Sequence, residues 1–241
     1  MDVALITGGN AGIGEAVVRS LAKTPNFHVI IGSRRLDSGN ELANSLKEQG
    51  YSVSAIQLDI TSDDSIDRAI EEITNIHGKL DVLVNNAGVL LDTQPDAFVS
   101  TRDLFPKTFN MNVFGTAALT EAALPLLQKS KHPRVIFVSS TMGLVAVSGD
   151  STTFFYDKYY KAYDASKAAV NILAVNYARI LKAYGGVPNA VCPGLVKTKM
   201  SGFIEAGTPV EVGAERIVQL ATAAPGGPSG TFSNKDGPVP W

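Results

Sequence analysis

The chain of 241 residues has little cysteine and little histidine. It contains one cysteine, Cys192, and three histidines, His28, His77 and His132. A single cysteine forms no internal disulfide, and the scattered histidines do not have the spacing of metal ligands. We therefore expect neither a disulfide framework nor a metal site, and this use of cysteine is typical of a reducing compartment.

The sequence also has no long apolar run and no cluster of charge of one sign. Its 21 Lys and Arg and 23 Asp and Glu residues are interspersed, and the formal net charge is −2. No basic stretch could follow a nucleic-acid backbone or an anionic lipid surface, and no apolar stretch reaches membrane-spanning length. The first residues lack the basic and apolar regions of a signal peptide. We expect a soluble, cytoplasmic protein without nucleic-acid or membrane partners.

Short β-branched runs alternate along the chain with longer segments of helical period. This alternation is typical of repeated βαβ units and predicts a Rossmann-type, doubly wound α/β fold: a seven-stranded parallel sheet with helices on both faces. The expected strands are Val3–Ile6, His28–Ile31, Val53–Gln57, Val82–Asn85, Arg134–Val138, Pro188–Val191 and a short one near Gly230–Phe232. Since no linker interrupts the pattern, we expect a single domain over residues 1–241.

Two further segments give structural expectations. Ile66, Ile70, Ile73 and Ile76 recur at helical spacing after the capping residues Thr61 and Ser62, so this helix should pack its isoleucine face on the sheet. The tail, with Pro225–Pro228 and Gly237–Trp241, is expected to form turns.

A glycine-rich segment, Thr7–Gly14, lies between the first strand and a helical pattern. Glycines let the backbone approach a pyrophosphate closely, and the start of the helix directs free N–H groups at that anion. Gly8, Asn10, Gly12, Ile13 and Gly14 are therefore candidate dinucleotide-binding residues.

The end of the second strand indicates which dinucleotide is bound. About twenty residues after the glycine-rich turn, NAD-binding chains place an acidic residue that holds the ribose hydroxyls. Here that position is Arg34, between Ser33 and Arg35. Guanidinium groups suit a 2′-phosphate and a hydroxyl adds a further bond, so the pattern predicts NADP(H), with Ser33 and Arg34 as ligands.

Tyr163 and Lys167 are the candidate acid-base pair. Reduction of a carbonyl needs a proton donor, and a tyrosine with an ordinary pKa near ~10 needs a nearby cation to serve at neutral pH. Lys167 lies one helical turn after Tyr163, and its charge should lower the pKa of the tyrosine. Tyr156, Tyr159 and Tyr160 lack a lysine four residues later.

Four motifs in this order resemble the short-chain dehydrogenase/reductase family, and its NADPH-dependent carbonyl reductases in particular. They are Thr7–Gly14, Asn85–Gly88, Tyr163 with Lys167, and Pro193–Thr198, and they span nearly the whole chain. The resemblance implies cofactor contacts around the adenine, in the cofactor groove and beside the nicotinamide. The residues in question are Asp59 and Ile60, then Asn86, Ala87 and Gly88, then Pro193, Gly194, Val196 and Thr198, with Tyr163 and Lys167 also touching the cofactor.

The resemblance completes the catalytic set. Judged by the family's Ser-x-x-Gly spacing, Ser140 with Gly143 is the serine that orients the substrate oxygen, whereas Ser139 is expected to make a turn or cap bond. Asn112 resembles the family's helix asparagine, which helps to hold a water linked to the lysine.

The connection from Ser140 to Tyr163 is longer than in compact family members. This insertion, near residues 144–162, is rich in aromatic residues and resembles the extended loops of monomeric carbonyl reductases. Its aromatics either line a pocket for a bulky ketone or pack on the surface and alter the contact between subunits. Residues 199–208 are expected to form a substrate lid.

These observations favour an enzyme that transfers a hydride from NADPH to a ketone or aldehyde carbonyl. The same residues would serve the oxidation of a secondary alcohol in reverse. A dinucleotide-sensing protein without turnover is the alternative of another class, although it would have no use for Tyr163 and Lys167. We expect the substrate to be a small-molecule carbonyl compound. Whether the chain forms a homo-oligomer is left open by the sequence.

Overall fold

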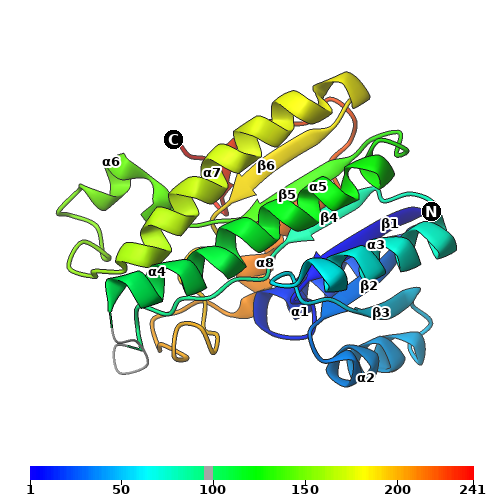
Figure 1. Ribbon diagram of the computed structural model, residues 1–241, viewed down its shortest axis with the longest axis horizontal. Coiled ribbons are helices and arrows are strands. Elements are labelled where there is room, and N and C mark those ends of the chain that lie inside the picture. Colours follow the sequence, from blue (N-terminus) through cyan, green and yellow to red (C-terminus); the bar gives the residue numbers. More distant parts are fainter. Residues whose placement is uncertain (95–99) are drawn as a thin grey trace.

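The computed structural model describes residues 1–94 and 100–241. One eight-stranded sheet forms its centre, in the order β3-β2-β1-β4-β5-β6-β7-β8 (Figure 1). All neighbouring strands are parallel except β7 and β8. The strands are β1 (Asp2–Thr7), β2 (Phe27–Ser33), β3 (Val53–Gln57), β4 (Val82–Asn85), β5 (Arg134–Val138), β6 (Val187–Val191), β7 (Phe232–Asn234) and β8 (Gly237–Pro238).

The Rossmann-type fold expected from the sequence is confirmed, with corrections at the C-terminal end. The last parallel strand begins at Phe232 and not at Gly230, and Gly237–Pro238, expected in a turn, forms the antiparallel β8. The turn residues are present, but they close a hairpin: the Asp236 N–H donates to the Asn234 side chain (2.9 Å), and Gly237 has a φ of 123°. A tight turn between two short strands therefore adds an eighth strand.

Helices cover both faces of the sheet. The helices α3 (Asp63–His77), α5 (Thr116–Leu127) and α7 (Lys161–Leu181) lie in front of the sheet in Figure 1. The helices α1 (Gly12–Ala22), α2 (Leu36–Lys47) and α8 (Val210–Ala221) pack on the opposite face. The shorter elements are α4 (Thr101–Phe109), the π-helix η2 (Asn110–Gly115), the 3-10 turns η3 (Thr141–Gly143) and η4 (Lys182–Tyr184), and α6 (Val145–Ser148).

Alternation along the strands divides the core into two halves. In β1, Val3 and Leu5 face the layer of α3, α5 and α7, whereas Ala4 and Ile6 face α1, α2 and α8. Successive side chains of a strand point to opposite faces, so a sheet covered on both sides needs continuous apolar runs. This requirement explains why the central strands β1, β4 and β5 could be recognised as mostly apolar segments.

The isoleucine helix is α3, and its expected face is partly wrong. Ser62 caps it by accepting the Ser65 N–H (3.3 Å), whereas Thr61 does not cap it. Ile66 and Ile73 are buried, but Ile76 is 65% exposed. Each step of three residues falls about 60° short of a full helical turn, so two such steps carry Ile76 off the buried face.

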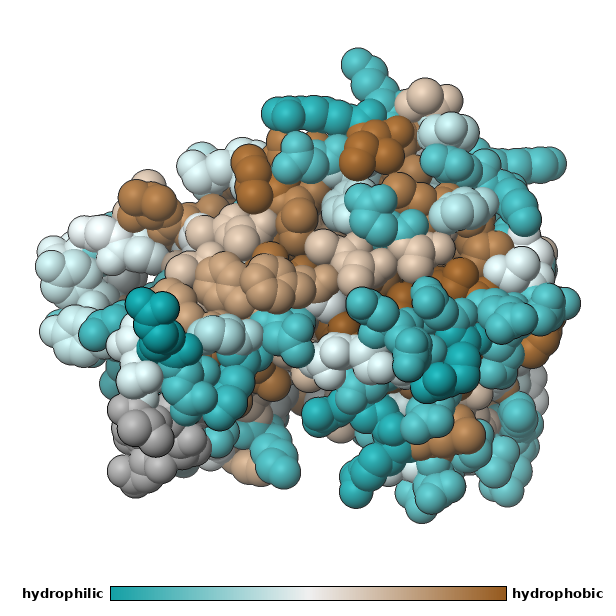
Figure 2. Space-filling model, in the orientation of Figure 1, coloured by the Kyte–Doolittle hydropathy of each residue, from teal (hydrophilic) through white to brown (hydrophobic). Residues whose placement is uncertain are grey.

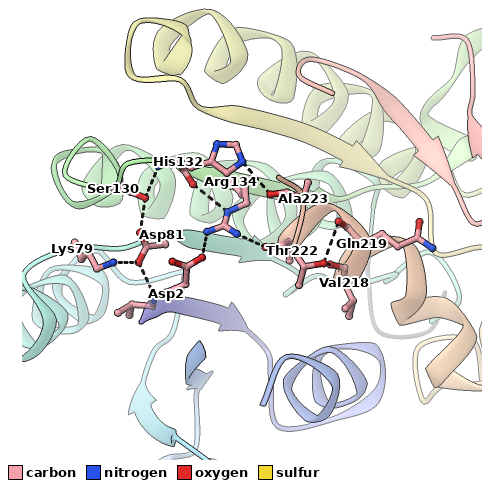
Figure 3. Close-up of polar contacts among 12 residues, drawn as sticks. Asp2, Lys79, Asp81, Ser130, His132, Arg134, Val218, Gln219, Thr222 and Ala223 are labelled. Atoms are coloured by element: carbon pink, nitrogen blue, oxygen red, sulfur yellow. Dashed lines mark hydrogen bonds and ion pairs between the residues drawn. The ribbon is translucent and has the colours of Figure 1, made fainter. Parts of the chain in front are cut away.

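The amino ends of β1, β4 and β5 are joined by buried polar contacts (Figure 3). Arg134 is 4% exposed; it forms an ion pair with Asp2 and donates to the carbonyl oxygens of His132 (3.2 Å) and Ala221 (3.0 Å). Asp81 accepts from the Val3 N–H (2.8 Å) nearby. These contacts fasten the edge of the sheet that lies opposite the carboxyl ends of the strands.

Apolar residues gather in the middle of the face formed by α5 and α7 (Figure 2). Phe114, Ile172 and Ile180 are exposed among the large hydrophobic residues. Within residues 1–94 and 100–241, no helix is long and apolar enough to cross a bilayer. No group of three or more His, Cys, Asp or Glu residues that could hold a metal ion is found in the same ranges.

Candidate active site

The sequence-predicted site residues gather at the carboxyl ends of the parallel strands. Thr7 ends β1, Asn85 ends β4, Ser139 follows β5 and Cys192 follows β6. The chain passes to one side of β1 through β2 and β3 and to the other side through β4, so the strand order reverses between β1 and β4. Doubly wound sheets bind ligands at such a switch point.

The glycine-rich segment forms the turn from β1 into α1. Gly8 and Gly12 have φ values of 62° and 56°, a region that favours glycine. A Cβ on Gly14 would lie 2.3 Å from the Gly8 carbonyl oxygen and 2.5 Å from the Asn86 Nδ2, so only glycine permits this packing. No side chain caps α1 at Ala11, which leaves the start of the helix able to receive an anion.

Thr7 joins the two loops of this edge, a role the sequence reasoning missed. Its hydroxyl oxygen accepts the N–H groups of Asn86 and Ala87, both at 2.9 Å, while the Asn86 side chain donates to the Thr7 carbonyl (2.8 Å). Thr7 is the first residue of the glycine-rich segment, and this position is the sequence signal from which its role could have been predicted. Asn86 therefore supports the glycine turn directly.

The end of β2 presents two arginines to solvent. Arg34 and Arg35 are exposed, and neither guanidinium pairs with an acidic group in the part of the chain that the structure describes. Ser33, the predicted ligand beside them, is buried, and its hydroxyl donates to the Arg35 carbonyl (2.8 Å). Asp59 accepts from the Thr61 N–H (3.0 Å) and hydroxyl (2.7 Å), and Ile60 is buried.

Lys167 and Tyr163 lie on one side of α7. The lysine is buried, its Nζ lies 5.5 Å from the centre of the Tyr163 ring, and it donates to the Val138 carbonyl oxygen (2.8 Å). Burial lowers the pKa of Lys167 to about 8, and Cys192 opposes this shift. An ammonium group beside a phenol is thus in place.

The pKa of Tyr163 moves opposite to the sequence expectation. Burial raises it most, the neighbouring Cys192 and Asp164 raise it further, and the Ser140 hydroxyl lowers it. Desolvation disfavours the phenolate, and the lysine at 5.5 Å from the ring does not reverse that effect. The protein's own groups therefore keep the phenol protonated.

The two serines after β5 have different roles. Ser139 was expected to make a turn or cap bond, but its hydroxyl donates to Asn171 (2.6 Å) on α7. Ser140 makes the cap: its hydroxyl oxygen accepts the Met142 N–H (3.1 Å) at the start of η3. A hydroxyl that accepts still has its own proton to donate. Ser140 therefore keeps a donor beside Tyr163.

The Ser-x-x-Gly spacing of Ser140 and Gly143 has a structural reason at Gly143. A Cβ there would lie 2.6 Å from both the Ala168 nitrogen and the Lys167 carbonyl carbon. Only glycine lets η3 press on the backbone of α7 at this point. The contact fixes Ser140 relative to Lys167.

Asn112 lies in the π-helix η2 and is buried. Its Oδ1 accepts the Val89 N–H (2.8 Å), and its Nδ2 donates to the Val89 carbonyl (2.9 Å) and to the Ser166 hydroxyl (3.0 Å). Its side chain thus connects the loop after β4 to α7. A Cβ on Gly88 would lie 3.2 Å from the Asn112 Oδ1 and 3.7 Å from the Lys167 Nζ, so Gly88 keeps this place open.

The segment after β6 closes the site from the side of α1. Gly194 has a φ of 80°, and a Cβ on Gly12 would lie 3.6 Å from the Thr198 Cγ2. Val196 is buried and forms an isolated parallel bridge with Thr208. This bridge joins Thr208, the last residue of the stretch 199–208, to a residue just before the stretch; within it, Met200 and Phe203 are exposed. Pro193 is half-buried at the start of the segment.

The insertion forms a hollow of about 340 Å³ beside the first turn of α7. Neither Tyr163 nor Ser140 lines it. Phe154 and Tyr159 are largely exposed, so both sequence interpretations of the aromatics stay open. The lining residues are Ser148, Tyr156, Lys158, Tyr159, Tyr160, Lys161 and Asp164.

Two acidic residues near Tyr163 were missed by the sequence reasoning. Asp92 accepts the N–H groups of Ala162 (2.9 Å) and Tyr163 (3.1 Å). Burial, together with the charge of Asp92, raises the pKa of Asp164 to about 7. Asp92 lies 70 residues from its partner in sequence, so no local pattern signals the contact.

Comparison with known proteins gives concordant results. The family model described as short chain dehydrogenase matches residues 2–208. The short-chain dehydrogenase/reductase ATR10 of Stachybotrys chlorohalonatus is 37% identical over 98% of this chain and 89% of the relative. Carbonyl reductase (NADPH) 1 of Rattus norvegicus is 32% identical over 99% of this chain and 98% of the relative. The crystal structure of NADPH-bound carbonyl reductase from chicken fatty liver superposes with a TM-score of 0.84 at 25% identity, with both chains fully covered.

Proposed function

Because this chain belongs to the short-chain dehydrogenase/reductase family, we propose that it is an NADPH-dependent reductase of a small-molecule ketone or aldehyde. The observation that carries the proposal is the meeting of Tyr163, Lys167 and Ser140 at the ligand-binding edge of the sheet. A proton donor, a cation and a hydroxyl at one place are what carbonyl reduction requires.

The residues present fit a nicotinamide dinucleotide. Gly8 and Gly12 hold a turn with positive φ, and the uncapped start of α1 suits a pyrophosphate. Arg34 and Arg35 are free to bind a 2′-phosphate. When bound, NADPH supplies the hydride. Further contacts are proposed for Asn10, Ile13, Gly14, Asp59, Ile60, Asn86, Ala87, Gly88, Pro193, Gly194, Val196 and Thr198, with Lys167 on the nicotinamide ribose.

The protein's own part is to position the substrate and to supply a proton. The Tyr163 phenol is protonated at neutral pH, so it has a proton to give to the substrate oxygen. Ser140, whose oxygen accepts the Met142 N–H, still has its own O–H to donate to the same substrate oxygen. Lys167 stabilises the phenolate that remains, since its ammonium is charged below about pH 8. Asn112 holds the loop at Val89 against α7.

Two relatives support the choice of cofactor and substrate. The rat relative is named a carbonyl reductase that uses NADPH, and the chicken structure holds NADPH. The same groups would also catalyse the oxidation of a secondary alcohol, because each proton transfer is reversible.

The proposal is tested by measuring turnover of a panel of aliphatic, aromatic and polycyclic ketones and aldehydes with NADPH and with NADH. We expect at least one carbonyl compound to be reduced, with NADPH preferred. Binding of NADPH without turnover of any compound would favour the dinucleotide-sensing alternative.

A further inference from the structure

The first turn of α7 receives its cap from a distant loop. Its N-cap residue, Tyr160, makes no side-chain capping bond. The Asp92 carboxylate instead accepts two of the free N–H groups. Its Oδ1 accepts the Ala162 N–H (2.9 Å), and its Oδ2 accepts the Tyr163 N–H (3.1 Å). A carboxylate at a helix N-terminus is favoured both by these bonds and by the helix dipole.

This cap acts on the tyrosine itself. One of the two donors is the backbone N–H of Tyr163, so the carboxylate fixes the residue that carries the phenol. The loop that carries Asp92 is held three residues earlier, where Asn112 bonds both polar backbone groups of Val89. Asn112 also bonds Ser166 on α7. The loop after β4 and the catalytic helix are thus joined at two points, one turn apart on α7.

We propose that Asp92 is a positioning residue for Tyr163, holding the phenol in register with Ser140 and Lys167. The inference rests on the proposed function, since it concerns the proton donor of that reaction. Displacement of a reacting group by about 1 Å can cost on the order of a hundredfold in rate. A helix end without its cap frays, and here the frayed turn would include Tyr163.

The charges around the cap agree with this role. Asp164 lies on the same turn, and one of its carboxylate oxygens is buried with no hydrogen-bond partner among residues 1–94 and 100–241. Its pKa rises to about 7 because of burial and of the Asp92 charge. Lys158 and Lys161, which line the hollow with Asp164, are exposed to solvent. The structure therefore keeps Asp92 next to a second acidic group, an unfavourable placement that the two backbone bonds offset.

The test compares Asp92→Ala, Asp92→Asn and Asp92→Glu with wild type. Asp150→Ala is the matched control, because the Asp150 carboxylate likewise accepts two hydrogen bonds, but from Thr152 (2.8 and 2.7 Å) in its own loop and not from α7. We expect Asp92→Ala to lower kcat roughly ten- to a hundredfold, with the KM for ketone and the Kd for NADPH within about twofold of wild type. Asp92→Asn, which keeps one acceptor oxygen, should lose less, and Asp150→Ala should match wild type.

Two measurements on the protein without ligand separate this inference from the proposed function. Amide hydrogen exchange at Ala162 and Tyr163 should be faster in Asp92→Ala and unchanged in Asp150→Ala. The pKa of Asp164, followed by carboxyl ¹³C NMR, should fall in Asp92→Asn because a like charge is removed. Unchanged exchange and an unchanged Asp164 pKa would show that the cap does not exist in solution.

Faster exchange with a wild-type kcat would show that the cap is structural only, and would overturn the positioning role. A rise in KM with unchanged kcat would overturn it too, because it would place Asp92 in substrate binding. A wild-type protein that reduces no carbonyl compound would remove the proposed function, whereas the exchange data would still report the cap.

Discussion

The ammonium nitrogen of Lys167 lies 5.5 Å from the centre of the Tyr163 ring, one helical turn away on α7, and is held there by the Val138 carbonyl. Burial moves the two pKa values in opposite directions, to about 8 for the lysine and upward for the tyrosine. At neutral pH the pair is therefore a neutral phenol beside a cation. In this state Tyr163 has a proton to donate, as carbonyl reduction requires.

Replacing Tyr163 by Phe should remove the proton donor and keep the ring. We expect kcat for carbonyl reduction to fall by roughly 10²–10⁴-fold, with the Kd for NADPH nearly unchanged. Tyr177→Phe is the matched control on the same helix, because its hydroxyl bonds Glu121 (2.9 Å) away from the site. Steady-state kinetics and a fluorescence titration measure both quantities, and undiminished turnover in Tyr163→Phe would contradict the assignment.

Replacing Lys167 by Ala should weaken both turnover and cofactor binding, because one ammonium serves both. A charge-assisted hydrogen bond contributes about 1.5–3 kcal/mol, so we expect the Kd for NADPH to rise roughly ten- to a hundredfold, with a lower kcat. Lys182→Ala, at an exposed lysine just after α7, should change neither. An unchanged Kd in Lys167→Ala would remove the ribose contact.

The pH dependence of the wild-type protein should report Lys167. The ammonium is charged below its pKa of about 8 and loses its proton as the pH rises through that value. We expect kcat/KM for NADPH, which reflects ionisations of the free protein, to be level near pH 7 and to decline above about pH 8. A profile that rises across this range would mean that the lysine charge is not required.

Cofactor preference should depend on Arg34. The wild-type protein should favour NADPH over NADH by roughly ten- to a hundredfold in kcat/KM, and Arg34→Asp should reduce or reverse this ratio, since a carboxylate repels the 2′-phosphate. Arg35→Asp is the companion variant at the neighbouring exposed arginine. If only Arg35→Asp loses the preference for NADPH, binding of the 2′-phosphate is assigned to Arg35. Equal use of NADPH and NADH by wild type would contradict the prediction.

Arg134 should matter for stability and not for chemistry. Arg134→Ala removes a buried guanidinium bonded to Asp2, His132 and Ala221, at the edge of the sheet opposite the site. Breaking a buried ion pair costs about 3–5 kcal/mol, although Asp2 is partly exposed, so we expect the lower end of this range in urea unfolding. Arg19→Ala, which removes a surface pair with Glu15, should cost less than about 1 kcal/mol. If Arg134→Ala lowers the free energy of unfolding by less than about 1 kcal/mol, the prediction is contradicted.

The sequence sufficed where the signal was local. Lys167 follows Tyr163 by one helical turn, and the central strands β1, β4 and β5 are mostly apolar, so both could be predicted from local sequence. The roles of Ser139 and Ser140 could not be assigned by the same means, because the backbone after β5 decides which hydroxyl points to α7. The role of Asp92 could not be predicted, since its contact with Tyr163 depends on how the loop after β4 meets α7 in the folded chain.

The contact of Gly143 with α7 has a consequence for how this protein can change over evolutionary time. The insertion begins directly after Gly143, which packs against Lys167 and Ala168. It ends at Ala162, whose N–H donates to Asp92. Both ends of the loop are thus anchored to the same helix. Mutations that lengthen or rewrite residues 144–160 would leave the phenol, the ammonium and the serine hydroxyl where they are. The molecule thereby separates a loop that can diversify from the proposed chemical centre.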